Sequence, residues 1–384
     1  MSDIRWTRRL LLSASLAAGM MGTAQAQSAI TIGYSGPLSG GAALYGKNTL
    51  VGLEMAAKEI NDAGGFEVAG KKHTLTVIGL DDKYAPSQTA VNAKRLRSQN
   101  NAPVIFTPHS GGAFALQAFN ETDDFILGAY TSVPSITERG NTLTLRIPPN
   151  FVGYIQPFVR EQMTRFGKKL GVAAADHDYA KTWTQLFVEA WKQAGGEVVS
   201  VNNMSYNKDT DFYSGVSRVL AAKPDVMFVG GASEPTAIVV KQARELGFKG
   251  GFAVMDQAKL NEMIEIAGGL TALEGSIGVM PLIYDQRPGA DTFVAKYRKL
   301  YNSDPGTEMS YHYASLYAVV EAMKLSGTTT DTKAIYARLG EAFGKLPVDK
   351  NPARITGIDA RGGSNAKVVI AIIENGKIVP IDLD

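Results

Sequence analysis

The 384-residue chain contains no cysteine and only four histidines. Without cysteine it cannot form a disulfide framework, an iron–sulfur cluster, a thiol nucleophile or a cysteine-ligated zinc site. Asp176-His177-Asp178 resembles a metal cluster in composition, but no second histidine lies nearby in the sequence. A loop with helix-capping acids is the favoured interpretation, and we predict no metal and no cofactor.

Long apolar runs are equally scarce. The run from Leu10 to Met21 follows Arg5, Arg8 and Arg9 and precedes Ala24-Gln25-Ala26. It is well short of the ~20 residues that a membrane-spanning helix needs. The pattern therefore predicts that residues 1–26 are a signal peptide cleaved near Ala26, with an N-terminal membrane anchor as the alternative.

The chain has almost no net charge, with 39 basic and 37 acidic side chains. Removing residues 1–26 takes away three arginines and one aspartate, which leaves 36 of each sign. A neutral mature chain offers no electrostatic footprint for nucleic acid, so we predict no nucleic-acid partner.

Several motifs of enzymes are missing. The chain has no Walker A loop and no dinucleotide-binding G-x-G-x-x-G. It also lacks the G-x-S-x-G nucleophile elbow, because residues 33–37 match that pattern except at Pro37. A hydrolase that uses Ser110 with a neighbouring histidine remains a remote alternative, and we predict that the protein is not an enzyme.

From residue 30 onward, short apolar runs alternate with segments of helical period, which is typical of an α/β fold with parallel strands. The strand candidates are Ile30–Ser35, Leu75–Leu80, Val104–Phe106, Phe125–Leu127, Leu170–Ala175, Val198–Val201, Val226–Val229 and Phe252–Val254. Pro148 and Pro149 interrupt the alternation, and neither can join a central strand. The length and this break together favour two domains.

The C-terminal third departs from strict alternation. Its pattern predicts helices near Asp291–Tyr301, Tyr311–Leu325 and Asp331–Phe343. Strands are predicted near Arg354–Ile358 and Lys367–Ile373.

Polar residues follow two of the predicted strands directly. Val104–Phe106 leads to Ser110 at the start of a predicted helix, and Phe125–Leu127 leads to Tyr130-Thr131-Ser132. Open α/β sheets bind ligands at the carboxyl ends of their strands, and a helix N-terminus favours a carboxylate. Ser110 is therefore either a ligand contact or only the cap of its helix.

The order and spacing of several short motifs resemble the leucine/isoleucine/valine-binding proteins, which are type I periplasmic solute-binding proteins of ABC importers. The motifs are Gly36-Pro37-Leu38-Ser39-Gly40, Tyr45-Gly46, Gly52, Glu59 to Gly65, Asp81-Asp82, Pro86, Gly230-Gly231 and Tyr313-Ala314. The resemblance implies two Rossmann-like lobes joined by three crossing strands, with a ligand between them. The expected boundaries are residues 27–148 and 282–360 for lobe 1, and 149–281 and 361–384 for lobe 2.

The resemblance also implies roles for individual residues. Ser110, Tyr130 and Ser132 would hold a ligand carboxylate, and Asp256 would pair with a ligand ammonium. Tyr45 and Tyr179 match aromatic positions that close over the ligand. The sequence alone leaves two alternatives open: Asp256 as an exposed loop aspartate, and Tyr45 and Tyr179 as ordinary packing or surface tyrosines.

Four positions depart from the family pattern, one of them Ala180, which follows Tyr179 where relatives have glycine. Tyr84 and His109 stand where some relatives have a disulfide, so His109 either donates to an acid group or is a loop histidine bonded to backbone. Ala232 replaces a bulky aromatic of branched-chain binders. This suggests a ligand larger than leucine, such as an aromatic amino acid or an aromatic carboxylate.

The resemblance implies a monomeric periplasmic protein that captures a small solute with a carboxylate, a branched-chain or aromatic amino acid. Its expected partners are an ABC permease and its ATPase subunits at the inner membrane. The alternatives within the same transport role are a benzoate-like or phenylpropenoate-like acid and a small amide such as urea.

Overall fold

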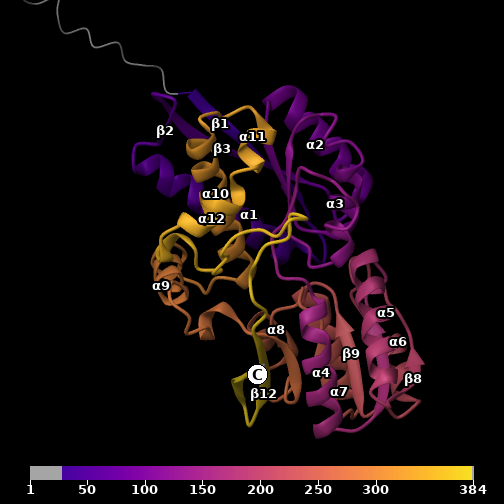
Figure 1. The fold of residues 1–384 in the computed structure, drawn as a ribbon. Helices are drawn as coiled ribbons and strands as arrows, with labels where there is room; N and C mark the ends of the chain where they lie inside the picture. Colours follow the sequence, from indigo (N-terminus) through magenta and orange to yellow (C-terminus); the bar gives the residue numbers. More distant parts are fainter. Residues whose placement is uncertain (1–27, 383–384) are drawn as a thin grey trace, which may run out of the picture.

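The computed structural model describes residues 28–382, which form two sheets of mostly parallel strands with helices packed around each (Figure 1). The predicted signal peptide, residues 1–26, lies outside the described residues. Within residues 28–382, no helix has the length and apolar character required to cross a membrane. The α/β fold predicted from alternating runs is confirmed.

The first sheet contains six strands in the order β2-β3-β1-β4-β5-β6. Only β2 runs antiparallel to its neighbour. The strands are β1 (Ser28–Gly36), β2 (Phe66–Val68), β3 (Lys71–Asp81), β4 (Val104–Thr107), β5 (Ile126–Ala129) and β6 (Thr144–Arg146). All residues of β4 and β5 are buried, as expected for parallel strands covered on both faces by helices.

Seven helices accompany the first sheet, and we call this unit the first lobe. They are α1 (Ala43–Asp62), α2 (Pro86–Asn100), α3 (Ser110–Gln117), α9 (Ala290–Tyr301), α10 (Thr307–Ser326), α11 (Thr332–Tyr336) and α12 (Leu339–Lys345). The long helices α1 and α10 pack against each other. Helices α9 to α12 return from the C-terminal third of the chain to this lobe (Figure 1).

The second sheet contains seven strands in the order β13-β12-β11-β10-β9-β7-β8. The strands are β7 (Lys169–Ala174), β8 (Glu197–Val201), β9 (Val226–Gly230), β10 (Gly251–Val254), β11 (Ser276–Val279), β12 (Ile370–Glu374) and β13 (Lys377–Ile381). Strands β12 and β13 form an antiparallel hairpin on the β11 edge.

Five helices cover the second sheet and complete the second lobe. They are α4 (Val152–Arg165), α5 (Asp178–Gln193), α6 (Tyr213–Leu220), α7 (Ser233–Glu245) and α8 (Leu260–Ala267). Their apolar faces are buried: α5 places Trp183, Phe187 and Trp191 in the core, where Phe187 stacks on Phe228 of β9 at 4.3 Å between ring centroids. This is the i, i+4, i+8 spacing that the sequence shows.

The chain passes between the lobes three times: after β6, after β11 and before β12. An isolated bridge between Arg146 and Gly363 links the first and third crossing segments, and the second contains the short 3-10 helix Leu282–Tyr284. Figure 1 shows the last crossing as the yellow segment that leads down to β12. The exact residue boundaries expected for the two lobes stay a prediction.

Two C-terminal predictions need correction. Residues 354–358 form no strand, because Arg354 has φ +55° and the Asn351 side chain bonds both the N–H and the C=O of Ile355. Those backbone groups are then not free to pair with a neighbouring strand. The helix predicted over 331–343 is two short helices, α11 and α12, interrupted between Tyr336 and Leu339.

Candidate functional site

A small cavity lies between the two lobes, at the carboxyl ends of strands from both sheets. Its volume is about 20 Å³, which corresponds to the space of about one water molecule. The lining residues are Tyr45, Tyr84, Pro108, His109, Ser110, Tyr130, Thr131, Ser132, Pro148, Tyr179, Asp256 and Gln257. Because each parallel sheet presents its strand ends at one edge, residues far apart in the sequence converge here.

The first lobe brings hydroxyl groups to the cavity from the ends of β4 and β5. Ser110 Oγ and Thr131 Oγ1 lie 2.6 Å apart and form a hydrogen bond. Ser132 is only 2% exposed, and its Oγ has no hydrogen-bond partner in the described part of the chain. A buried hydroxyl without a partner is costly, so Ser132 is suited to bond a ligand atom in the cavity.

Ser110 does not cap helix α3. His109 is the N-cap residue, and its Nδ1 accepts the N–H of Gly112 at 3.0 Å. Ser110 is instead the first residue of α3, so its hydroxyl is free of the capping role and bonds Thr131. The main-chain amides of this first helical turn and the serine hydroxyl together form a donor-rich edge that favours an anionic group.

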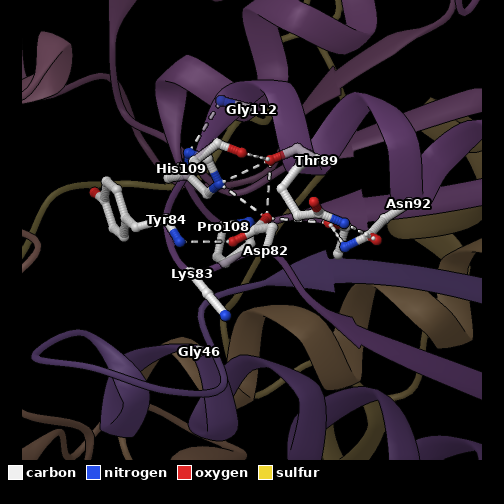
Figure 2. A network of polar contacts seen from close by, with 12 residues as sticks. Gly46, Asp82, Lys83, Tyr84, Thr89, Asn92, Pro108, His109 and Gly112 are labelled. Carbon is white, nitrogen blue, oxygen red and sulfur yellow. Dashed lines mark hydrogen bonds and ion pairs between the residues drawn. The ribbon is translucent and has the colours of Figure 1, made fainter.

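His109 is fixed within the first lobe by a buried carboxylate (Figure 2). Its Nε2 lies 3.0 Å from Asp82 Oδ2, and Asp82 is fully buried. Nδ1 accepts a hydrogen bond from the N–H of Gly112, so Nε2 carries the ring hydrogen and donates a hydrogen bond to Asp82. Both ring nitrogens are engaged in the protein. His109 therefore shapes the cavity wall and has no nitrogen left for a ligand.

Asp82 is the centre of this network. Its Oδ2 also accepts the hydroxyls of Ser35 at 3.0 Å and Thr89 at 2.9 Å, while Oδ1 accepts the N–H of Tyr84 at 2.9 Å (Figure 2). These donors satisfy a carboxylate that burial would otherwise make costly. The network fixes the loop after β3 against the loop after β4.

Tyr84 connects the two lobes. Its ring stacks on His109 with centroids 4.6 Å apart, and its hydroxyl accepts from Gln257 Nε2 at 3.0 Å. The ring of His177, the N-cap residue of α5, also packs against the ring of Tyr84, with centroids 5.1 Å apart. Gln257 is 6% exposed, and its Oε1 has no hydrogen-bond partner among the residues that the structure describes, so Gln257 brings a second unsatisfied polar atom to the lining.

Asp256 of the second lobe faces the hydroxyls of the first. Its Oδ1 accepts the Tyr179 hydroxyl at 2.6 Å and Trp183 Nε1 at 2.8 Å. Neither bond involves Oδ2, which has no hydrogen bond among the described residues. Burial, and next the charge of Asp256, raise the pKa of Tyr179 well above its usual range, so the phenol stays a donor. Asp256 thus brings a carboxyl group of the second lobe to the cavity.

Tyr45 and Tyr130 enclose the cavity from the first lobe. The Tyr45 hydroxyl donates to the Pro108 carbonyl at 2.8 Å, and the two rings lie 6.1 Å apart. Burial raises the pKa of both phenols well above their usual range. With Tyr84 and Tyr179 they make a lining of four neutral tyrosine rings.

His177 packs behind the cavity lining, against the rings of Tyr84 and Tyr179. It caps α5 through Nδ1, which accepts the N–H of Ala180 at 3.4 Å. Burial lowers the pKa of His177 to about 4, against the opposing effect of Asp176. The Asp176-His177-Asp178 segment is thus a helix start, and no group of three or more His, Cys, Asp or Glu side chains suited to a metal occurs in residues 28–382.

The structure brings together seven of the eight residues singled out in the sequence. Ala232 is the exception: it is not among the lining residues, and it lies at the start of α7 in the second lobe, 2% exposed and packed against the apolar core of the first lobe. The expected extra volume beside Ala232 is therefore not part of this cavity. Gln257, Thr131 and Tyr84 line the site without having been assigned to it; their position directly after strands was the available signal.

A comparison with protein families matches residues 29–371 to the model described as periplasmic binding protein. A Leu/Ile/Val-binding protein homolog of Brucella suis is 29% identical over 338 residues, covering 82% of this chain and 81% of the relative. A leucine-, isoleucine-, valine-, threonine- and alanine-binding protein of Pseudomonas aeruginosa is 24% identical and covers 93% of each chain.

Solved structures share the fold. A leucine-binding protein of Thermotoga maritima superposes with a TM-score of 0.76 at 22% identity, covering 92% of this chain and 98% of that one. The branched-chain amino acid transporter substrate-binding protein LivJ of Streptococcus pneumoniae, in complex with isoleucine, gives 0.77 at 23% identity, covering 92% and 99%. At these identities the likeness shows the architecture alone.

Proposed function

The chain belongs to the periplasmic binding protein family, of the Leu/Ile/Val-binding type, and from its cavity we propose that it captures a hydrophobic α-amino acid for an ABC importer. Its relatives are solute-binding proteins rather than enzymes. The proposed place of action is the periplasm, after cleavage near Ala26.

One observation carries the proposal: the cavity has opposite polarity at its two ends. Hydroxyls and helix-start amides of the first lobe, at Ser110 and Ser132, face a carboxylate of the second lobe, Asp256. A zwitterion satisfies both ends at once, because its carboxylate meets the donors and its ammonium meets Asp256 Oδ2. A ligand that contacts only one end would leave the carboxylate or the hydroxyls at the other end unpaired.

The two ends belong to different lobes, so the proposed ligand favours the state in which the lobes meet. A ligand that touches both lobes binds the closed form more tightly and shifts the population toward it. The cavity of about 20 Å³ is smaller than an amino acid, so the lobes or the tyrosine rings have to move apart to admit it. We propose lobes of 27–148 with 282–360, and 149–281 with 361–384, and a monomer that docks on a permease with its ATPase subunits.

An aromatic carboxylate is the second candidate. Four tyrosine rings line the cavity, and aromatic rings pack favourably on one another in offset or edge-to-face arrangements. Such an acid would use the hydroxyl end of the site and make no use of the charge on Asp256.

Thermal unfolding with a panel of solutes tests the proposal. Leucine, isoleucine and phenylalanine are expected to stabilise the protein by about 2.7 kcal/mol at 100 times the dissociation constant. Parallel samples contain 4-hydroxybenzoate, a phenylpropenoic acid or urea. Stabilisation by the acids alone would favour the second candidate, and stabilisation by urea alone would point to a small amide. If no member of the panel has an effect, the proposed function is wrong.

A further inference from the structure

A second buried polar site lies between the lobes, outside the lining of the cavity. Asn48 of α1 donates through Nδ2 to Glu262 Oε1 at 2.9 Å and to Glu308 Oε1 at 2.8 Å. Glu262 is on α8 of the second lobe, whereas Asn48 and Glu308 are on α1 and α10 of the first. One amide nitrogen thus holds two carboxyl groups from opposite lobes.

One oxygen of each carboxyl group lies close to the backbone of Gly306. A Cβ atom at that position would lie 2.6 Å from Glu262 Oε1 and 2.7 Å from Glu308 Oε1, so both oxygens approach the same point and no side chain fits there. Glu308 is fully buried, and its second oxygen, Oε2, has no hydrogen-bond partner within residues 28–382. Glu262 Oε2 accepts the hydroxyl of Ser233 on α7 at 2.6 Å.

The basic side chains around Glu262 and Glu308 supply little positive charge to these two carboxyl groups. Burial, and next the negative charge of Glu308, raise the pKa of Glu262 well above its usual range, while Lys259 acts in the opposite direction. The Lys259 ammonium itself bonds the carbonyl oxygens of Asp256 and Gln257, not a carboxyl group. On α10, the ring of His312 bonds the Glu308 carbonyl, and burial lowers the pKa of His312 to about 4, so it adds no positive charge near neutral pH.

Tyrosines complete the titratable surroundings. The charge of Glu308 acts on Tyr34, Tyr45 and Tyr130, and burial raises the pKa of each well above its usual range. They stay neutral when a glutamate titrates.

Two adjacent carboxylates, with Glu308 buried and Glu262 half-buried, cannot both ionise at low cost, because each charge repels the other and the hydration of both is reduced. We propose that Glu262, Glu308 and Asn48 form a proton-binding site of the closed state, in which the two carboxyl groups share one proton and link closure of the lobes to pH. The proposal rests on the lobe movement of the proposed function and not on the identity of the solute.

The direction of the effect follows from the location of the two glutamates. When the lobes part, Glu262 leaves with the second lobe, its carboxyl group gains water, and its pKa returns toward the ordinary glutamate value of about 4.3. The closed state then holds a proton that the open state releases. As the pH rises from that ordinary value to the raised one, the closing equilibrium falls by up to about tenfold per pH unit. By reciprocity, a ligand that closes the lobes takes up a proton.

Distance measurements between spin labels on the two lobes test the proposal without any ligand. The chain has no cysteine, so Val91→Cys on α2 and Val201→Cys at the end of β8 would be its only thiols. Both positions are exposed, at 59% and 57%. We expect the closed fraction to fall severalfold or more between about pH 5.5 and pH 8.5.

Glu262→Gln and Glu308→Gln, each in the labelled background, imitate the protonated state. In each variant the closed fraction is expected to stay at its acidic level across the pH range. Glu265→Gln is the matched control, because it makes the same change at an exposed position of the same helix and should leave the pH dependence intact.

A closed fraction that is equal at both pH values in the labelled background would overturn the proposal, whether or not the variants fold. A pH dependence that persists in both glutamine variants would overturn it as well. The solute panel is independent of this result. A protein that binds amino acids but closes equally at both pH values would refute the proton site alone, and the reverse outcome would refute the proposed function alone.

Discussion

The ring of Tyr84 stacks on the ring of His109, with centroids 4.6 Å apart and an angle of 23° between the planes. The family resemblance places a disulfide of some relatives at these two positions. Here a non-covalent contact joins the loop after β3 to the loop after β4, and the Tyr84 hydroxyl continues the connection to Gln257 of the second lobe. The same two residues thus join neighbouring loops and reach across the cleft.

His109→Ala is expected to lower the free energy of unfolding by about 3 kcal/mol, because buried Asp82 loses a donor and α3 loses its cap. Urea denaturation followed by circular dichroism measures this. Tyr84→Phe is the control: it keeps the stacked ring, removes only the hydroxyl, and is expected to cost less than about 1 kcal/mol. Equal stability of His109→Ala and the parent protein would contradict the role given to the network.

Asp256→Asn is expected to weaken leucine binding by roughly tenfold to 100-fold, because the amide keeps an oxygen for Tyr179 and Trp183 but loses the charge that meets an ammonium. Calorimetric titration gives the dissociation constants. Asp176→Asn, on an exposed side chain just after β7 and outside the cavity lining, serves as the control. Undiminished leucine binding by Asp256→Asn would remove this carboxylate from the site.

Ser132→Ala and Ser110→Ala are expected to separate binding from stability. Ser132 Oγ is buried without a partner, so its removal should leave the melting temperature unchanged or higher while affinity for leucine falls about tenfold. Ser110→Ala breaks the bond to Thr131, so it should lower both. The comparison requires melting curves and titrations of both variants. A clear loss of stability in Ser132→Ala would show that its hydroxyl has a structural partner.

His177→Asn is expected to change the pH dependence of stability. Burial lowers the pKa of folded His177 to about 4, whereas the unfolded residue titrates near 6.5. Its contribution is therefore complete above pH 6.5 and is lost as the pH falls toward 4, by up to about 1.4 kcal/mol per unit. Asparagine can still cap Ala180 but cannot take up a proton.

The measurement is urea denaturation of the parent and His177→Asn at pH 7.5 and 5.0. The parent should lose about 2 kcal/mol more than the variant over this interval. A third series at pH 8.5 is the control, because neither state of the histidine titrates between 7.5 and 8.5. Parallel pH profiles for the two proteins would contradict the buried, neutral state of His177.

The fold could be predicted where the pattern is local. Short buried strands such as β4 and β10 are continuous apolar runs, and α5 shows its buried face in the spacing of Trp183, Phe187 and Trp191. Residues 354–358 misled the prediction because Asn351, a neighbour in sequence, bonds Ile355 and takes the place of a strand partner. Side-chain competition for backbone groups leaves no trace in hydropathy.

The sequence by itself determined which residues could meet at a site, because strand ends in a parallel sheet lie at one edge and the polar residues after β4, β5, β7 and β10 can be read directly. Only the tertiary structure decided what each one does. The sequence makes His109 a candidate ligand contact, but in the structure Asp82 and Gly112 engage both of its ring nitrogens. It makes Ala232 a candidate pocket residue, but the packing of the two lobes buries Ala232 among apolar side chains. The carboxyl pair of Glu262 and Glu308 comes from helices on different lobes, so its proximity depends on the packing of the two lobes and not on any spacing along the chain.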